Sequence, residues 1–128
     1  MLLVKTKIRP SKISGIGLFA DEFIPEGTPV WKFMPGFDLE ISQDKLAELS
    51  EGSQSQVLNY SYFNPKTGNY VLPFDDARFF NHADEPNTTS GPNDSFIDRA
   101  ARDIKKGEEL TQNYKIFDGD NIRKLSMP

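Results

Sequence analysis

The sequence predicts many short elements joined by turns, most of them strands, with one or two short helices. Three features support this prediction: turn residues are spread along the whole chain, apolar runs are short, and one spacing pattern occurs twice. Nine glycines and nine prolines in 128 residues favour many short elements joined by turns. A chain of this length forms one domain, and its 12% of aromatic residues can fill a single core.

The composition excludes several classes of protein. Without cysteine the chain has neither disulfides nor thiolate metal sites, and its one histidine argues against a metal site built on imidazoles. No apolar run approaches the ~20 residues of a membrane span. Lys5 and Lys7 follow the first apolar residues at once, which leaves no room for the core of a signal peptide. We therefore expect a soluble, cytoplasmic protein with no metal and no membrane contact.

Charge is unevenly distributed around a net value of −4. Between residues 71 and 98 one cation, Arg78, stands against six acids: Asp75, Asp76, Asp84, Glu85, Asp94 and Asp98. Such a region repels nucleic acid and attracts a basic partner. A solvated loop surface is the alternative explanation, and on charge alone it is the simpler one.

The first segments are predicted as strands. Val4, Thr6 and Ile8 alternate with basic residues, which is typical of a half-buried strand that ends at Pro10. Residues 13–20 then read ISGIGLFA and contain the glycine spacing of a dinucleotide fingerprint. That motif requires a helix to follow, and the prolines at 25 and 29 prevent one. A glycine hairpin remains, in which the backbone can approach another group closely.

The middle of the chain is predicted to contain both strand and helix. Residues 30–33 favour a short strand, and residues 41–49 favour a helix that Ser42 caps, with Leu46 and Leu49 on its apolar side. The sequence then favours a weaker helical turn, a tight turn and a strand, at residues 54–60, 64–69 and 70–72.

The segment at residues 96–104 has helical spacing, but a comparison within the chain argues for strand. Four residues of an earlier segment have the same mutual spacing as four of this one: Ala20, Ile24, Gly27 and Val30 against Ala100, Ile104, Gly107 and Leu110. The earlier copy carries two prolines and cannot be a helix interior. If the copies are alike, the second is also strand, turn at Lys106-Gly107, and strand.

Two further segments carry specific expectations. Residues 75–87, DDARFFNHADEPN, place two phenylalanines among polar residues, so part of this stretch should be buried. Buried Asn81 and His82 would then need hydrogen-bond partners, either from the protein or from a ligand. In the polar C-terminal segment the expected apolar anchors are Ile116, Phe117, Ile122 and Leu125.

Three motifs together resemble the SET-domain family of protein lysine methyltransferases. SGIGLFA at 14–20, ARFFNHADEPN at 77–87 and GEELTQNY at 107–114 are similar to family motifs in the family's order. The resemblance covers about residues 5–117, so it implies a single SET domain over 1–128, with 118–128 as a C-terminal tail. It also implies a mainly β fold of several small sheets with a C-terminal pseudoknot, in which the last segment tucks under an earlier loop.

The resemblance implies S-adenosylmethionine as the methyl donor. Cofactor contacts are then expected from Gly15, Ile16, Gly17, Arg78, Asn81, His82 and Phe117. Glycine would be needed at the hairpin because a side chain would hold the ligand away. Arg78 has two interpretations, since it would stand near the cofactor carboxylate or hold an internal acid. His82 is interpreted as a structural hydrogen-bonding residue beside the cofactor and not as a general base.

The resemblance makes Tyr114 the expected catalytic residue, because its hydroxyl would orient the lysine amine. Tyr60, Tyr62 and Tyr70 are candidates for the wall of the lysine channel, although each could instead belong to the core. Ala83 departs from the family's preferred serine, which is a change between two small residues. The cysteine-rich zinc modules, part of which helps to close the site in family members, are absent, and Phe117 is the candidate for an aromatic cover in their place.

The function implied is protein-lysine N-methylation on a basic protein or peptide. The alternative is a catalytically weak SET module that binds the cofactor or a basic peptide. No nucleic-acid partner is expected, and a homodimer remains compatible with the sequence.

Overall fold

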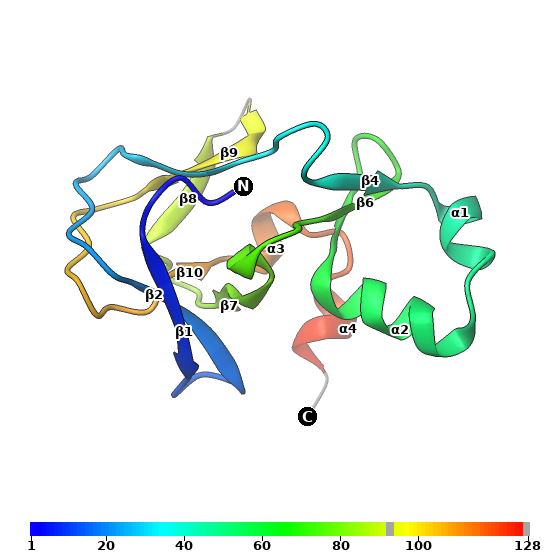
Figure 1. Cartoon of the computed structure of the whole chain (residues 1–128), viewed down its shortest axis with the longest axis horizontal. Coiled ribbons are helices and arrows are strands. Elements are labelled where there is room, and N and C mark those ends of the chain that lie inside the picture. The colour runs from blue at the N-terminus through cyan, green and yellow to red at the C-terminus, as the bar shows by residue number, and fades with distance from the viewer. Residues whose placement is uncertain (92–93, 127–128) are drawn as a thin grey trace.

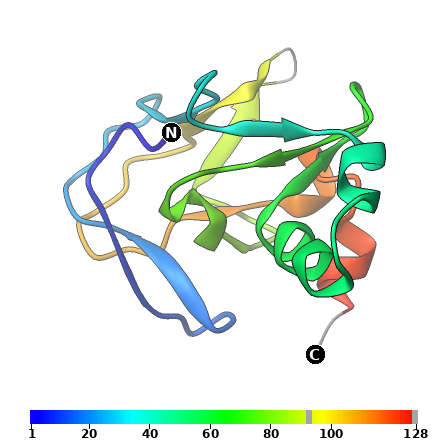
Figure 2. The same ribbon diagram turned by 45° about the vertical axis from the view of Figure 1, so that its right-hand side comes forward.

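A computed structural model describes residues 1–91 and 94–126, and for residues 91, 94 and 95 it describes the backbone alone. Figures 1 and 2 show small sheets in the middle, the β1–β2 hairpin at one end and helices α1 and α2 at the other. The predicted mainly β fold is confirmed. The two-stranded sheets are β1–β2 and the parallel pair β10–β7, and the three-stranded ones are β3–β9–β8 and β4–β6–β5.

The strands are short, as the distribution of turn residues indicates. They are β1 (Thr6–Pro10), β2 (Ile16–Ala20), β3 (Pro29–Lys32), β4 (Leu39–Ile41), β5 (Tyr62–Asn64), β6 (Asn69–Leu72), β7 (Asn81–His82), β8 (Thr88–Gly91), β9 (Asp94–Ala100) and β10 (Thr111–Gln112). The helices are α1 (Gln43–Ala47), α2 (Glu51–Tyr60), α3 (Tyr114–Phe117) and α4 (Asn121–Leu125), with a 3₁₀ turn at Asp76–Phe79. None of these helices is long and apolar enough to cross a membrane.

The repeated spacing corresponds to two segments that pair with each other. Ile24 and Ile104 exchange both of their backbone hydrogen bonds at 2.8 Å, and both side chains are fully buried. Gly27 N–H donates to the carbonyl of Ala100, while Gly107 N–H donates to that of Ala20. Both glycines have positive φ, 83° and 94°, which explains why the turns require glycine. The prediction of strand, turn and strand for the second copy is confirmed.

Asn87 fixes the C-terminal motif against the 75–87 stretch. Its Oδ1 accepts from the Thr111 N–H at 2.9 Å, and its Nδ2 donates to the Glu109 carbonyl at 2.8 Å. The parallel pairing of β10 with β7 runs beside this contact. The chain after β10 is thereby brought alongside Asn81 and His82, as the expected pseudoknot requires.

The helical predictions hold with shifted boundaries. Ser42 does cap α1, since its hydroxyl accepts from the Lys45 N–H at 3.1 Å. Ile41, however, belongs to β4, where pairing with Tyr70 of β6 overrides the helical pattern. Leu46 is buried as expected, whereas Leu49 is exposed because α1 ends before it. The weaker helical turn becomes a full helix, α2, that begins at Glu51.

Two predictions of burial are only partly right. Val4 and Thr6 are half-buried as expected, whereas Ile8 keeps 44% of its surface in solvent because β1 pairs only with β2 in a two-stranded hairpin. In the tail, Ile116, Ile122 and Leu125 are also exposed. Of the expected anchors, Phe117 does pack inside, with its ring 5.2 Å from that of Tyr62 between centroids. Asp118, at 2% exposure, holds the tail beside it through polar contacts. Residues 127–128 lie outside the described part.

Gly52 offers a test of helix α2. It lies in the first turn after the Ser50 cap, and a methyl group added there would meet no atom within 4 Å. We expect Gly52→Ala to raise the free energy of unfolding by about 0.5–1 kcal/mol, because alanine loses less backbone entropy on folding. Urea unfolding followed by circular dichroism measures the change. A lower midpoint would show that the start of α2 is not helical in solution.

Candidate active site

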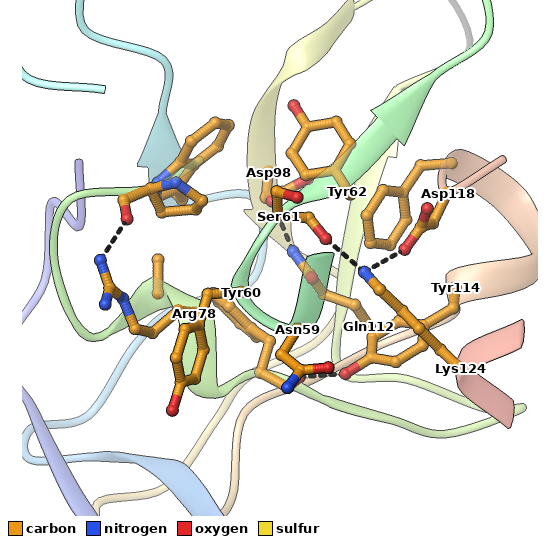
Figure 3. A pocket seen from close by; sticks show the side chains of 15 residues that line it. Asn59, Tyr60, Ser61, Tyr62, Arg78, Asp98, Gln112, Tyr114, Asp118 and Lys124 are labelled. Atoms are coloured by element: carbon orange, nitrogen blue, oxygen red, sulfur yellow. Dashed lines mark hydrogen bonds and ion pairs between the residues drawn. The ribbon is translucent and has the colours of Figure 1, made fainter. Parts of the chain in front are cut away.

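A pocket lies where the end of α2, the start of β5 and the segment around α3 meet (Figure 3). It brings together five residues that the sequence singled out: Tyr60, Tyr62, Arg78, Tyr114 and Phe117. It also contains residues that the sequence did not assign to a site, among them Trp31, Ser61, Phe80, Asp98, Gln112, Asp118 and Lys124. Outside its lining are Gly15, Ile16, Gly17, Tyr70, Asn81 and His82.

Tyr114 is held at the pocket by hydrogen bonds at both ends of the residue. It begins α3, its backbone N–H donates to His82 Nδ1 at 3.1 Å, and its hydroxyl donates to the Phe80 carbonyl. Burial, with smaller effects from the Asp118 and Glu109 charges, raises the pKa of Tyr114 to about 12. At neutral pH the side chain is therefore a phenol, whose proton is engaged and whose oxygen lone pairs can accept a further hydrogen bond.

Aromatic side chains form one wall beside Tyr114. The Tyr62 ring meets Phe117 edge-on at 5.2 Å between centroids and Trp31 at 6.5 Å. Burial, reinforced by the Asp98 charge, raises the pKa of Tyr62, so this side chain is also a neutral phenol. Tyr70 instead packs on Phe63 at 5.1 Å in the β5–β6 hairpin. The structure thus brings two of the three candidate channel tyrosines, Tyr60 and Tyr62, to the pocket.

Several buried polar atoms of the pocket lack a protein partner. Trp31 Nε1, the Tyr62 hydroxyl and Arg78 Nε have no hydrogen-bond partner within the described residues. Arg78 donates from Nη2 to the Pro73 carbonyl at 2.9 Å and lies over the Tyr60 ring, 5.0 Å from its centre. Because buried polar groups normally have partners, these atoms suit water or a ligand with acceptor groups.

The glycine hairpin forms a second cluster with Asn81 and Glu109. Asn81 Nδ2 donates to the Ser14 carbonyl at 3.1 Å and to Glu109 Oε2 at 2.9 Å. Glu109 also accepts from the Ser11 hydroxyl at 2.8 Å. A methyl group at Gly17 would lie 2.8 Å from Glu109 Cδ, so this carboxylate would have to move to admit any side chain there. The need for glycine at this position has an explanation within the chain.

His82 follows Asn81 in β7 and contacts Tyr114. Its Nδ1 accepts from the Tyr114 N–H, so the ring proton of the neutral form lies on Nε2, which is 3.0 Å from Asp84 Oδ1. Hydrogen bonds from His82 and then Lys115 lower the pKa of Asp84. Both ring nitrogens are engaged within the chain, which argues against His82 as a general base.

Asp118 and Asp98 supply the buried acids of the pocket. Asp98 accepts from Gln112 Nε2 at 2.7 Å, and Asp118 Oδ2 lies 2.6 Å from Lys124 Nζ. Sequence reasoning missed Asp118 and Lys124 because both lie beyond the last motif, in a polar tail with no recognisable pattern. Their meeting depends on the turn between α3 and α4, which local sequence does not specify.

The acidic stretch is only partly available to a partner. Asp75 accepts from the N–H groups of Leu2 and Ala77, and so stabilises the 3₁₀ turn. Asp84 contacts Lys115 at 3.2 Å as well as His82. The side chain of Asp94 lies outside the described residues. Attraction of a basic partner stays a prediction. Across residues 1–91 and 94–126, no group of three acidic, histidine or cysteine side chains is placed to hold a metal.

The raised pKa of Tyr114 predicts a specific loss of stability in alkali. The folded state keeps the phenol proton from the ordinary pKa of 10.0 up to about 12, so its stabilising contribution is present below pH 10 and is lost as pH rises toward 12. The free energy of unfolding should fall there by up to ~1.4 kcal/mol per pH unit for this group. Tyr114→Phe should show a shallower fall in denaturant titrations at successive pH values. Parallel curves for the two proteins would contradict a perturbed Tyr114.

The sequence and the structure both match known proteins. The family described as SET domain matches residues 15–115. No curated protein matches at a significant level. Among solved structures, a candidate histone methyltransferase from Plasmodium falciparum is 21% identical, with a TM-score of 0.58 over 88% of this chain and 95% of its own.

Structures of Polycomb Repressive Complex 2 from Chaetomium thermophilum are also similar. One, in an autoinhibited conformation bound to S-adenosylmethionine, is 25% identical with a TM-score of 0.66 over 95% of this chain. Another, bound to GSK126, is 25% identical with a TM-score of 0.67 over 95% of this chain. This chain spans 16% and 17% of those two chains, so each compares with it through one part of a much longer protein.

Proposed function

The chain belongs to the SET-domain family, and from this premise we propose that it is a protein-lysine N-methyltransferase that uses S-adenosylmethionine. Family membership and the structural neighbours support methyltransferase activity in general. One observation carries the choice of lysine as acceptor. The neutral hydroxyl of Tyr114 faces a pocket whose aromatic wall, Tyr62 and Phe117, suits the stem and head of a lysine side chain.

The residues of both clusters fit the donor. Trp31 Nε1 and Arg78 Nε are unsatisfied donors that suit its carboxylate and ring acceptors, and aromatic faces suit its cationic sulfonium. Ile16 is half-exposed at the hairpin, next to Asn81, so this backbone is accessible to a ligand. S-adenosylmethionine would supply an activated methyl group bonded to sulfur. Gly15, Ile16, Gly17, Asn81 and His82 would hold it.

The chain's own residues would align and desolvate the acceptor amine. The Tyr114 hydroxyl donates its hydrogen bond to the Phe80 carbonyl, so its oxygen can accept a hydrogen bond from an N–H of the amine. This contact would direct the lone pair of the amine. The apolar rings of Tyr62 and Phe117 exclude water, which favours the uncharged amine over the ammonium. The proton that the lysine ammonium loses goes to solvent water outside the apolar wall, because both ring nitrogens of His82 are engaged within the chain.

Two measurements test the proposal. Isothermal titration calorimetry should show binding of S-adenosylmethionine to the purified chain. Radiolabelled methyl transfer onto a mixture of basic proteins, followed by amino-acid analysis, should yield methylated lysine. Binding of the donor with no transfer to any basic protein would favour a binding module over an enzyme. Absence of donor binding would contradict both interpretations.

A further inference from the structure

Helix α4 places a lysine of this same chain in the pocket. Lys124 Nζ lies 2.6 Å from Asp118 Oδ2, donates to the Ser61 carbonyl and stands 5.6 Å from the centre of the Tyr114 ring. Figure 3 shows its side chain reaching from α4 into the space between these groups. Only 16% of the side chain is exposed. A carboxylate, a carbonyl and a ring face together form a binding site for an alkylammonium ion.

This ammonium site does not depend on Lys124 for its shape. The Asp118 side chain is 1% exposed and also accepts from the backbone N–H groups of Phe63, at 3.0 Å, and Asp120, at 2.9 Å. The Tyr114 ring is fixed through its hydroxyl. The carboxylate and the ring face would therefore stay in place if the lysine left.

Helix α4 itself is weakly attached to the rest of the protein. None of its residues is buried, and Ile122 is 81% exposed. Besides Lys124, Arg123 Nη2 contacts the protein body through the Leu58 carbonyl at 3.0 Å. Segments with few buried apolar contacts open at low free energy, so α4 can detach while the core stays folded.

We propose that Lys124 occupies the pocket in place of a target lysine, and that a lysine from another protein enters only when α4 is displaced. This inference rests on the proposed function, because it takes the same pocket to be the acceptor site. Helix α4 holds Lys124 in its ion pair with Asp118, where the ammonium has no lone pair for methyl transfer, so Lys124 blocks the pocket without reacting. A lysine of another protein is not held there by α4, so after entering it can move to the Tyr114 hydroxyl and react as the uncharged amine.

A purely structural role for Lys124 makes a different prediction. Helix α2 has no basic residue in its last turn, and carbonyls at its end, of Leu58 and Ser61, accept from Arg123 and Lys124. Cations at this end of a helix are stabilising. If capping were the whole role, losing Lys124 would lower stability and leave the pocket's affinity for lysine unchanged.

The test is a titration of the full chain with Nα-acetyl-lysine methylamide, monitored by NMR and carried out without any methyl donor. Lys124→Ala should bind this probe roughly tenfold to hundredfold more tightly than the wild type, because the wild-type pocket is available only while α4 is open. Arg123→Ala, which loosens α4 and leaves the pocket groups intact, should also bind more tightly. Lys45→Ala, on the exposed face of α1, should bind like the wild type.

Two outcomes would overturn the proposal. The first is probe affinity that is equal in the wild type, Lys124→Ala and Arg123→Ala, with circular dichroism showing folded proteins. The second is methylation of Lys124 itself, detected by mass spectrometry after incubation with S-adenosylmethionine. Because the titration uses no donor, it gives its answer even if the chain proves inactive as a methyltransferase. The norleucine analogue of the probe, which lacks the charge, should not bind to any of the proteins.

Discussion

Tyr114→Phe is expected to lower the rate of methyl transfer by roughly a hundredfold or more, while S-adenosylmethionine still binds. Only the hydroxyl is lost, and with it the lone pairs that orient the acceptor amine. The ring remains, and so does its edge-on contact with the Phe117 ring, whose centroid lies 6.1 Å away. Single-turnover transfer onto a basic protein measures the rate, and calorimetry measures donor binding.

Tyr114→Phe should also lower stability, by less than is needed to explain the loss of rate. Losing the hydrogen bond to the Phe80 carbonyl should cost about 1 kcal/mol of folding free energy, which a urea titration would detect. That cost leaves most molecules folded, so it cannot account for a hundredfold loss of rate. Tyr70→Phe is the matched control, because Tyr70 does not line the pocket, and its rate should equal that of the wild type. Full activity in Tyr114→Phe would remove Tyr114 from the mechanism.

Gly17→Ala is expected to destabilise the fold by about 2–3 kcal/mol, through one contact. The backbone at Gly17 does not have positive φ, so the conformation itself accepts alanine. The added methyl group would instead collide with the Glu109 carboxylate, whose Cδ would lie 2.8 Å away. Glu109 could move only by giving up its hydrogen bonds to Ser11 and Asn81.

A double-mutant cycle isolates that contact. In Glu109→Ala the obstacle is gone, so adding Gly17→Ala should cost much less than it does in the wild type. Urea unfolding of the four proteins provides the comparison. If the two substitutions have additive effects, the requirement for glycine does not come from Glu109, and contact with a ligand becomes the better explanation.

Repeated spacing and three motifs allowed much of the fold to be predicted from the sequence. The match between the Ala20–Val30 and Ala100–Leu110 segments identified strand and turn where helical periodicity pointed elsewhere, because proline in one copy restricts both. Strand β4 was missed, since Ile41 also fits a helical pattern and only its pairing with Tyr70 decides the outcome. Long-range pairing of this kind leaves no local signal.

The candidate site was predictable where a motif reached it. Tyr114 and Phe117 were identified and line the pocket, as do Tyr60 and Tyr62, two of the three tyrosines expected in the channel wall. Asp118 and Lys124 were not identified, because a carboxylate and a cation in a polar tail look like a solvated surface. The error in the tail has the same origin. Four apolar residues were expected to anchor it, whereas Phe117 and a buried ion pair do.

The reciprocal pairing around Ile24 and Ile104 has a consequence for biosynthesis. The backbone N–H groups of Ala20, Ile24 and Gly27 donate to carbonyls of residues 100–108. The early segment therefore cannot complete its backbone hydrogen bonds until the later segment is present. During translation, its apolar side chains must wait until the later partner has left the ribosome. Contacts between such distant parts also close slowly. This domain should therefore complete its fold only after the segment around Ile104 has emerged, and it should depend on protection from aggregation until then.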